Sequence, residues 1–225
     1  MIPIRDTIPS RRTAWVTRVL LVANVAAFAL ELHQGAGLES FVYRYGMVPT
    51  HWLISSPSDF LDWPHLFLTL LTCQFLHASF FHLGANMLYL WIFADNVEDR
   101  LGPLRFLLLY LGSGVAAAVA QILVSPASSV PMVGASGAIA GVLGAYLLMF
   151  PAAKIVTLVP LGFFLEAVEL PAFLFLGFWF LLQWFQGLLA IGQVADTGGV
   201  AFWAHIGGFV SGMAGVAMMR PPRRW

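Results

Sequence analysis

The sequence predicts an all-α membrane protein whose helices cross the bilayer six times. Hydrophobic residues make up 60% of the 225 residues and charged residues only 10%, which lies outside the range of water-soluble domains. Six apolar stretches can also be assigned to the roughly 30 Å of membrane hydrocarbon. They lie near residues 14–32, 80–96, 104–124, 136–150, 170–191 and 200–219.

The positive charges support this assignment and orient the spans. With an even number of spans, nine of the eleven Lys and Arg residues fall on one side of the membrane: Arg5, Arg11, Arg12, Arg100, Arg105, Lys154, Arg220, Arg223 and Arg224. Such residues collect in cytoplasmic loops. Both termini are therefore expected in the cytoplasm, in a multi-pass protein of a bacterial inner membrane. Acidic residues also number eleven, so no basic surface for nucleic acid is expected.

The chain is predicted to form one domain, 14–219, between cytoplasmic tails at 1–13 and 220–225. The first span is interpreted as a membrane helix rather than a cleaved signal sequence, because it is long and contains Arg18 and Asn24. The segment between the first two spans, here called the outer loop, mixes aromatic and charged residues. Pro49, Pro57 and Pro64 interrupt any long helix in it. It is expected to lie in the outer interface of the membrane.

Ser136 is the first candidate for chemistry, in Gly134-Ala135-Ser136-Gly137, where a loop meets the fourth span. A helix over 136–150 is only about 22 Å long at 1.5 Å per residue. Its outer end is therefore expected below the membrane surface, beside a loop that lines a wet cavity. The free N–H groups of a helix N-terminus suit an oxyanion. The alternative is an ordinary N-cap serine.

His205 is the second candidate, near the start of the last span. An uncharged imidazole there can accept a proton from a serine, although a histidine bonded to a backbone carbonyl is the alternative. Glycines follow both candidates at helical spacings: Gly137, Gly141 and Gly144 after Ser136, and Gly208, Gly212 and Gly215 after His205. If the fourth and sixth spans pack through these glycines, Ser136 and His205 come within reach of each other.

His82 and Asn86 form the third candidate, because their spacing places them on one face of the second span. Two donors on one face can stabilise a developing oxyanion, and interhelical hydrogen bonding is the alternative. His77, at the end of the outer loop, is interpreted as structural.

Other intramembrane chemistries lack their residues. The sequence contains no His-Glu-x-x-His, and no two spans each carry a central aspartate, so neither a metal nor another cofactor is expected. Cys73 is interpreted as a small buried hydrophobe. Asp196 lies nine residues before His205, so no carboxylate is well placed to orient the imidazole. A Ser-His dyad is therefore predicted rather than a Ser-His-Asp triad.

The sequence resembles the rhomboid family of intramembrane serine proteases over almost its whole length. The most specific matches are Gly134-Ala135-Ser136-Gly137, Ala204-His205 with its trailing glycines, and His82-x-x-x-Asn86. Supporting matches are Val97-Glu98-Asp99-Arg100-Leu101-Gly102, Tyr43-Arg44 and Ile4-Arg5-Asp6.

The resemblance implies a six-helix rhomboid bundle with an interfacial outer loop between helices 1 and 2. It implies that Ser136 is the nucleophile and His205 the general base of a serine endopeptidase. The oxyanion would be held by the Ser136 N–H group, His82 and Asn86. Structural support would come from Gly134, Gly137, Gly141, Gly208 and Gly212, and from a cytoplasmic polar cluster of Glu98 and Arg100.

The resemblance also implies the partners and leaves points open. Substrates would be single-span or other transmembrane proteins, reaching the site through the lipid near the second and fifth spans, with Trp179 as a gate. Ala140 stands where some family members have a tyrosine beneath the histidine, so the residue that holds the His205 ring in place is left open.

One alternative function is that of a catalytically silent relative that binds membrane clients. Another is a small transporter or channel, which predicts repeats and a polar path that the sequence lacks.

Overall fold

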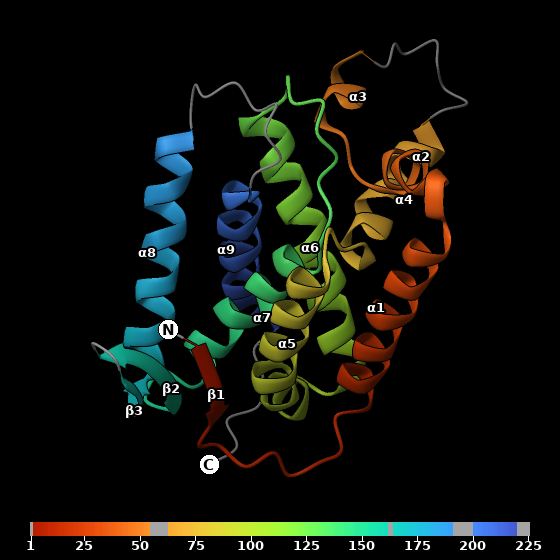
Figure 1. The fold of residues 1–225 in the computed structure, drawn as a ribbon. Helices are drawn as coiled ribbons and strands as arrows, with labels where there is room; N and C mark the ends of the chain where they lie inside the picture. Colours follow the sequence, from red (N-terminus) through yellow and green to blue (C-terminus); the bar gives the residue numbers. More distant parts are fainter. Residues whose placement is uncertain (1, 55–62, 162–163, 191–199, 220–225) are drawn as a thin grey trace.

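The structure is a computed structural model that describes residues 2–54, 63–161, 164–190 and 200–219. It is predominantly helical (Figure 1). The helices are α1 (Trp15–His33), α2 (Leu38–Tyr45), α3 (Pro49–Ile54), α4 (Trp63–Thr72), α5 (Phe80–Leu101), α6 (Pro103–Val124), α7 (Ser136–Met149), α8 (Ala172–Ala190) and α9 (Phe202–Met219). A 3₁₀ turn, η1 (Gly35–Gly37), lies between α1 and α2, and a second, η2 (Cys73–Phe75), lies between α4 and α5.

Four of the described helices, α1, α6, α8 and α9, are long and apolar enough to cross a membrane. A fifth candidate is α5, which follows the segment Trp63–Phe75 across a break with a bend of 82°. Helix α7 is apolar but has only 14 residues. The structure therefore confirms the expectation of a helix-rich membrane protein. The expected count of six spans is reached only if the short helix α7 is counted as a span in addition to these five candidates.

Helix α7 is the centre of the bundle. Every residue from Gly137 to Tyr146 is buried, because α5, α6, α8 and α9 all contact this helix. A helix buried on all sides needs no polar face, which fits its uniformly small and apolar sequence. Figure 1 shows α7 between α5 in front and α9 behind.

Glycines allow α7 and α9 to pack backbone against backbone. A Cβ atom on Gly208 would collide with the carbonyl oxygen of Gly137, and one on Gly212 would collide with that of Gly141. On the α6 side, a Cβ atom on Gly141 would collide with Ser113. Small residues at these positions therefore set how closely the helices approach.

The outer loop is largely helical, because α2, α3 and α4 occupy it. Two of its prolines begin helices rather than interrupt them: Pro49 is the first residue of α3 and Pro64 the second of α4. Pro57 lies outside the described residues. The loop is tied to the chain before α7, since the N–H of Met47 donates to the carbonyl of Met132 at 3.1 Å and that of Met132 donates back at 2.8 Å.

A three-stranded antiparallel sheet corrects the prediction of an all-α fold. Its order is β1 (Ile2–Asp6), β2 (Lys154–Leu161) and β3 (Phe164–Pro171). Ile2 pairs with Leu158 and Asp6 with Ile155, with a register shift between Pro3 and Arg5. Residues expected in an N-terminal tail thus form an edge strand. The sequence of β2 shows no polar and apolar alternation, and its β-branched residues are inconspicuous because apolar residues are frequent throughout this chain.

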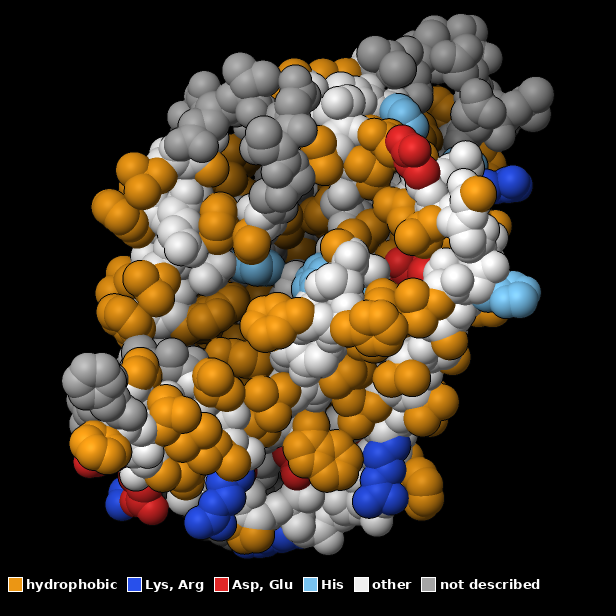
Figure 2. Space-filling model, in the orientation of Figure 1, with side chains coloured by type: hydrophobic (Ala, Val, Ile, Leu, Met, Phe, Trp, Pro, Cys, Tyr) orange, Lys and Arg blue, Asp and Glu red, His pale blue; other side chains and the backbone are white. Residues whose placement is uncertain are grey.

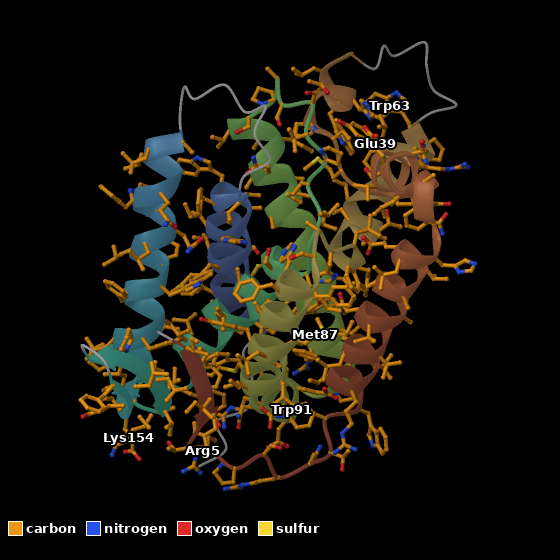
Figure 3. The ribbon with its side chains drawn as sticks, in the orientation of Figure 1. Arg5, Glu39, Trp63, Met87, Trp91 and Lys154 are labelled. Carbon is orange, nitrogen blue, oxygen red and sulfur yellow. The ribbon has the colours of Figure 1, made fainter. Side chains whose placement is uncertain are left out.

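The surface matches a chain surrounded by lipid. Hydrophobic side chains cover most of the face shown in Figure 2, and most Lys and Arg side chains gather at the end where the sheet lies. Figure 3 places Arg5 and Lys154 at that end and Glu39 and Trp63 at the opposite one. Between them, Trp91 of α5 is 62% exposed and Leu181 of α8 is 63% exposed. Exposed apolar side chains on this scale indicate a membrane protein.

Candidate active site

Ser136 is the first residue of α7, and its side chain does not cap that helix. The N-cap is Ala135, and no side-chain cap bond is present. The preceding Gly134 has φ +130°, a conformation that favours glycine, and its N–H donates to the Cys73 carbonyl at 2.9 Å. The chain is thereby turned so that Ser136 begins the helix with its hydroxyl free for another partner. An ordinary N-cap serine is not what the structure contains.

The partner of Ser136 is His205, from the first turn of α9. The Nε2 atom of His205 lies 2.8 Å from the Ser136 Oγ. Packing of α7 on α9 through Gly137 and Gly208 brings the two side chains together. His205 is only 9% exposed, and Ser136 is half-buried.

The second ring nitrogen of His205 has a partner that the sequence analysis missed. Its Nδ1 atom lies 2.7 Å from the Oε1 atom of Gln183 in α8. An amide oxygen only accepts, so Nδ1 carries the proton and Nε2 is left to accept from the serine hydroxyl. Gln183 had a detectable signal, because a buried polar residue in an apolar span points to function.

Trp179 also contacts His205. The two ring centroids are 5.8 Å apart and the planes are inclined by 34°. Trp179 lies one helical turn before Gln183, so one face of α8 supplies both contacts. The presence of Ala140 left open which residue holds the His205 ring in place. In the structure, Gln183 and Trp179 of α8 contact the ring in addition to Ser136.

His82 lies beside the Gly134 turn. A Cβ atom on Gly134 would come within 2.8 Å of the His82 Nε2 atom and within 3.5 Å of the Ser136 Oγ atom. The Ala78 N–H points to the His82 Nδ1 atom at 3.4 Å, which leaves the proton on Nε2. The N–H of His82 donates to the Ser79 hydroxyl at 3.1 Å, so the α5 N-cap fixes the start of this helix. His82 thus offers a ring N–H near the serine.

Asn86 lies one turn after His82 on α5 and is 6% exposed. Its Nδ2 group has no hydrogen-bond partner among the described residues. A buried donor without an acceptor costs free energy, so such a group marks a place where a ligand oxygen would be stabilised.

Glu31 fixes the approach to α5. Its buried carboxylate, on α1, accepts the backbone N–H of His77 at 3.0 and 3.2 Å. The His77 ring in turn packs edge-on against His82, with centroids 5.2 Å apart. His77 therefore has the structural environment expected of it. The sequence does not single out Glu31, because its partner is a backbone group 46 residues later.

Glu98 lies at the opposite end of the bundle and caps α1. Its carboxylate accepts from Val16 N at 3.0 Å, from Thr17 N at 2.8 Å and from the Thr17 hydroxyl at 2.8 Å. Charged acceptors at a helix N-terminus are favourable. Arg100 follows two residues later and is half-buried. Among the described residues, no group of three His, Cys, Asp or Glu side chains could hold a metal ion.

The arrangement can perform acyl transfer. It contains a serine hydroxyl, an imidazole that can take its proton, and nearby N–H donors at a helix N-terminus.

The Rhomboid domain model matches residues 64–222. The chain is 30% identical over 198 residues to "Rhomboid protein 1, mitochondrial" of Saccharomyces cerevisiae, covering 86% of this chain and 50% of that protein. It is 33% identical over 154 residues to "Rhomboid protease GluP" of Bacillus subtilis, covering 68% and 26%. It is 30% identical over 229 residues to "RHOMBOID-like protein 1" of Arabidopsis thaliana, covering 92% and 54%. The chain thus spans about half or less of the length of these relatives.

Proposed function

Because the chain belongs to the rhomboid family and is a multi-pass membrane protein, we propose that it is an intramembrane serine endopeptidase. It hydrolyses peptide bonds in or near the transmembrane segments of other membrane proteins. The observation that carries the proposal is the 2.8 Å contact between the Ser136 Oγ and His205 Nε2 atoms, between two helices, α7 and α9, that pack on each other through glycines and apolar residues. Two polar groups of this kind are costly inside a membrane protein and are usually functional.

The reaction proceeds through an acyl-enzyme. The Ser136 hydroxyl attacks the scissile carbonyl while His205 Nε2 takes its proton. The imidazolium then gives that proton to the leaving amine. A water molecule, deprotonated by the same nitrogen, attacks the ester carbonyl. The bond to the Ser136 oxygen then breaks, the imidazolium returns the proton to that oxygen, and the second product leaves with a new carboxyl group. The Nδ1 proton of His205 stays in place throughout.

The oxyanion of the tetrahedral intermediate is held by three donors. They are the Ser136 N–H group, the His82 ring and the Asn86 amide. The proposal is supported by the position of His82 beside Gly134 and by the Nδ2 group of Asn86, for which the described residues provide no acceptor. An acceptor that appears only during the reaction stabilises the transition state more than the ground state.

The proposed topology has six spans, with α7 as the short fourth span and both termini in the cytoplasm. It is supported by the positive charges near the sheet and by the length of α7. The rhomboid protease domain is 14–219, flanked by cytoplasmic segments at 1–13 and 220–225, in a bacterial inner membrane. The helical outer loop would then rest in the opposite interface.

Substrates are single-span or other transmembrane proteins that approach through the lipid between α5 and α8. Half-buried Met87 and exposed Trp91 line the visible side of α5 (Figure 3), and Trp179 lies on α8 against His205. Movement of α8 would therefore expose the catalytic pair. The competing proposal is a catalytically silent relative that only binds membrane clients.

A fluorophosphonate probe separates the two proposals. We expect the detergent-purified wild type to be labelled, and the Ser136→Ala and His205→Ala variants to remain unlabelled. The same variants should fail to cleave a single-span model substrate. A folded wild type that neither reacts with the probe nor cleaves the substrate would favour the client-binding relative.

A further inference from the structure

Helix α8 contributes a polar contact to His205 that the proposed reaction does not itself use. The Gln183 Oε1 atom lies 2.7 Å from His205 Nδ1. Both side chains are 9% exposed. A buried amide placed opposite a buried imidazole is costly unless each satisfies the other.

We propose that Gln183 is the positioning residue of this site, because it fixes the tautomer and the orientation of His205. The inference rests on the proposed protease function. Neutral imidazole carries one proton, which can lie on either nitrogen. With an acceptor at Nδ1, the proton stays there and the Nε2 lone pair faces Ser136. With the proton on Nε2, the ring could not take the serine proton.

A neutral amide suits this place better than a carboxylate. In a Ser-His-Asp triad, a buried aspartate orients the histidine and stabilises the imidazolium. A carboxylate in the apolar interior of this bundle would be expensive when it is not facing a cation. The Gln183 amide accepts the same hydrogen bond without introducing a charge. It also stabilises the imidazolium, since the Nδ1–H bond strengthens when the ring is charged.

The neighbours of His205 leave this task to Gln183. In the described part of the chain, the hydrogen bonds recorded for the imidazole are those to Ser136 and Gln183. Ala140 offers no polar side-chain atom. Trp179 packs against the ring and restricts its rotation, but its indole N–H is a donor and cannot accept a hydrogen bond from Nδ1.

The test compares three variants of the full chain in detergent. Gln183→Leu removes the acceptor at similar volume, Gln183→Glu keeps an acceptor at the same reach, and Gln186→Leu is the matched control from the exposed side of α8. The readouts are the maximal rate and the half-saturating concentration of fluorophosphonate labelling between pH 5 and 9. Thermal unfolding of each variant is followed in parallel.

We expect Gln183→Leu to lower the maximal labelling rate on the order of tenfold to a hundredfold, with little change in half-saturation. Its acidic limb should move to lower pH, because the imidazolium has lost an acceptor. Gln183→Glu should recover part of the rate at pH 8, because its carboxyl group still offers an oxygen to the Nδ1–H group, although burial of an acidic group lowers thermal stability. Gln186→Leu should match the wild type.

Two results would overturn the inference while leaving the protease proposal intact. One is labelling of Gln183→Leu within about twofold of the wild type. The other is an equal loss in Gln183→Leu and Gln183→Glu, at every pH and with equal loss of thermal stability, which would assign Gln183 a packing role. If the wild type itself is not labelled, the result contradicts the proposed protease function rather than the role of Gln183.

Discussion

A Cβ atom added to Gly208 would collide with the carbonyl oxygen of Gly137, so α9 has no room for a side chain where it meets the backbone of α7. Gly137 directly follows Ser136, and Gly208 lies one turn after His205. The same contact that packs α7 on α9 therefore sets the distance between the two polar side chains.

This contact predicts that Gly208→Ala separates Ser136 from His205. The added methyl would meet backbone atoms of Gly137, which cannot rotate away, so α9 must shift. Overpacking of this kind costs about 1–3 kcal/mol. We expect probe labelling to fall at least tenfold, because a misplaced catalytic group costs on the order of a hundredfold in rate.

Gly112→Ala is the matched control, since a Cβ atom at this glycine of α6 would meet nothing within 4 Å. It should leave labelling unchanged and stabilise the helix by up to about 1 kcal/mol. Normal labelling of Gly208→Ala would mean that the glycine contact does not govern the site.

His82→Ala and Asn86→Ala test the proposed oxyanion donors. Each should lower turnover of a single-span substrate on the order of a hundredfold, as loss of one such donor does elsewhere. The Michaelis constant should change little, because the oxyanion exists only during the reaction. Asn86→Ala should also keep or raise thermal stability, since it removes a buried donor that has no acceptor in the described part of the chain. Unchanged turnover would return both residues to a structural role.

Sequence patterns predicted this site where two signals coincided. Ser136 and His205 were recognisable because each is a polar residue in an apolar span and each is followed by glycines at helical spacing. Gln183 is also a polar residue in an apolar span, but a single glycine of α8, Gly187, follows it at helical spacing. Nothing in the sequence states that this turn of α8 faces α9. The contact between Gln183 and His205 becomes visible only when α7, α8 and α9 are packed together.

The sheet and Glu31 were missed for different reasons. Strand β2 contains a run of β-branched residues, Ile155, Val156 and Thr157, but the surrounding chain is so apolar that this run is inconspicuous. Glu31 accepts a backbone N–H from His77, 46 residues later. A side chain that satisfies a distant backbone group leaves no local pattern, so only the folded chain reveals it.

Glu98→Ala is expected to destabilise the bundle without altering the chemistry of the site. The substitution leaves two backbone N–H groups at the start of α1 and the Thr17 hydroxyl without their acceptor. Loss of a cap costs about 1 kcal/mol, and loss of bonds to a charged acceptor costs more, so about 2–4 kcal/mol is expected. Unfolding in mixed micelles would measure it. Glu166→Ala, on the exposed face of β3, is the control and should change little.

The environment of Asp6 predicts that the thermal stability of the protein depends on pH. Its Oδ2 atom accepts from the Tyr146 hydroxyl at 2.6 Å and from Asn96 Nδ2 at 2.8 Å, which ties β1 to α7 and α5. Burial raises the pKa of Asp6 from 3.8 to about 6; the Tyr146 hydrogen bond opposes this rise, and the nearby Asp95 adds to it. A pKa that is higher in the folded state means that folding favours the protonated carboxyl.

The protonated carboxyl of Asp6 contributes stability that is fully present below about pH 4 and is lost as the pH rises through about 6. The unfolding midpoint of the wild type should therefore fall across this interval. Asp6→Asn cannot titrate, so the difference between wild type and variant should change between pH 4 and 6.5 and then level off, whereas Glu166→Gln should follow the wild type. Thermal unfolding in detergent at fixed ionic strength measures all three, and parallel curves for wild type and Asp6→Asn would contradict the prediction.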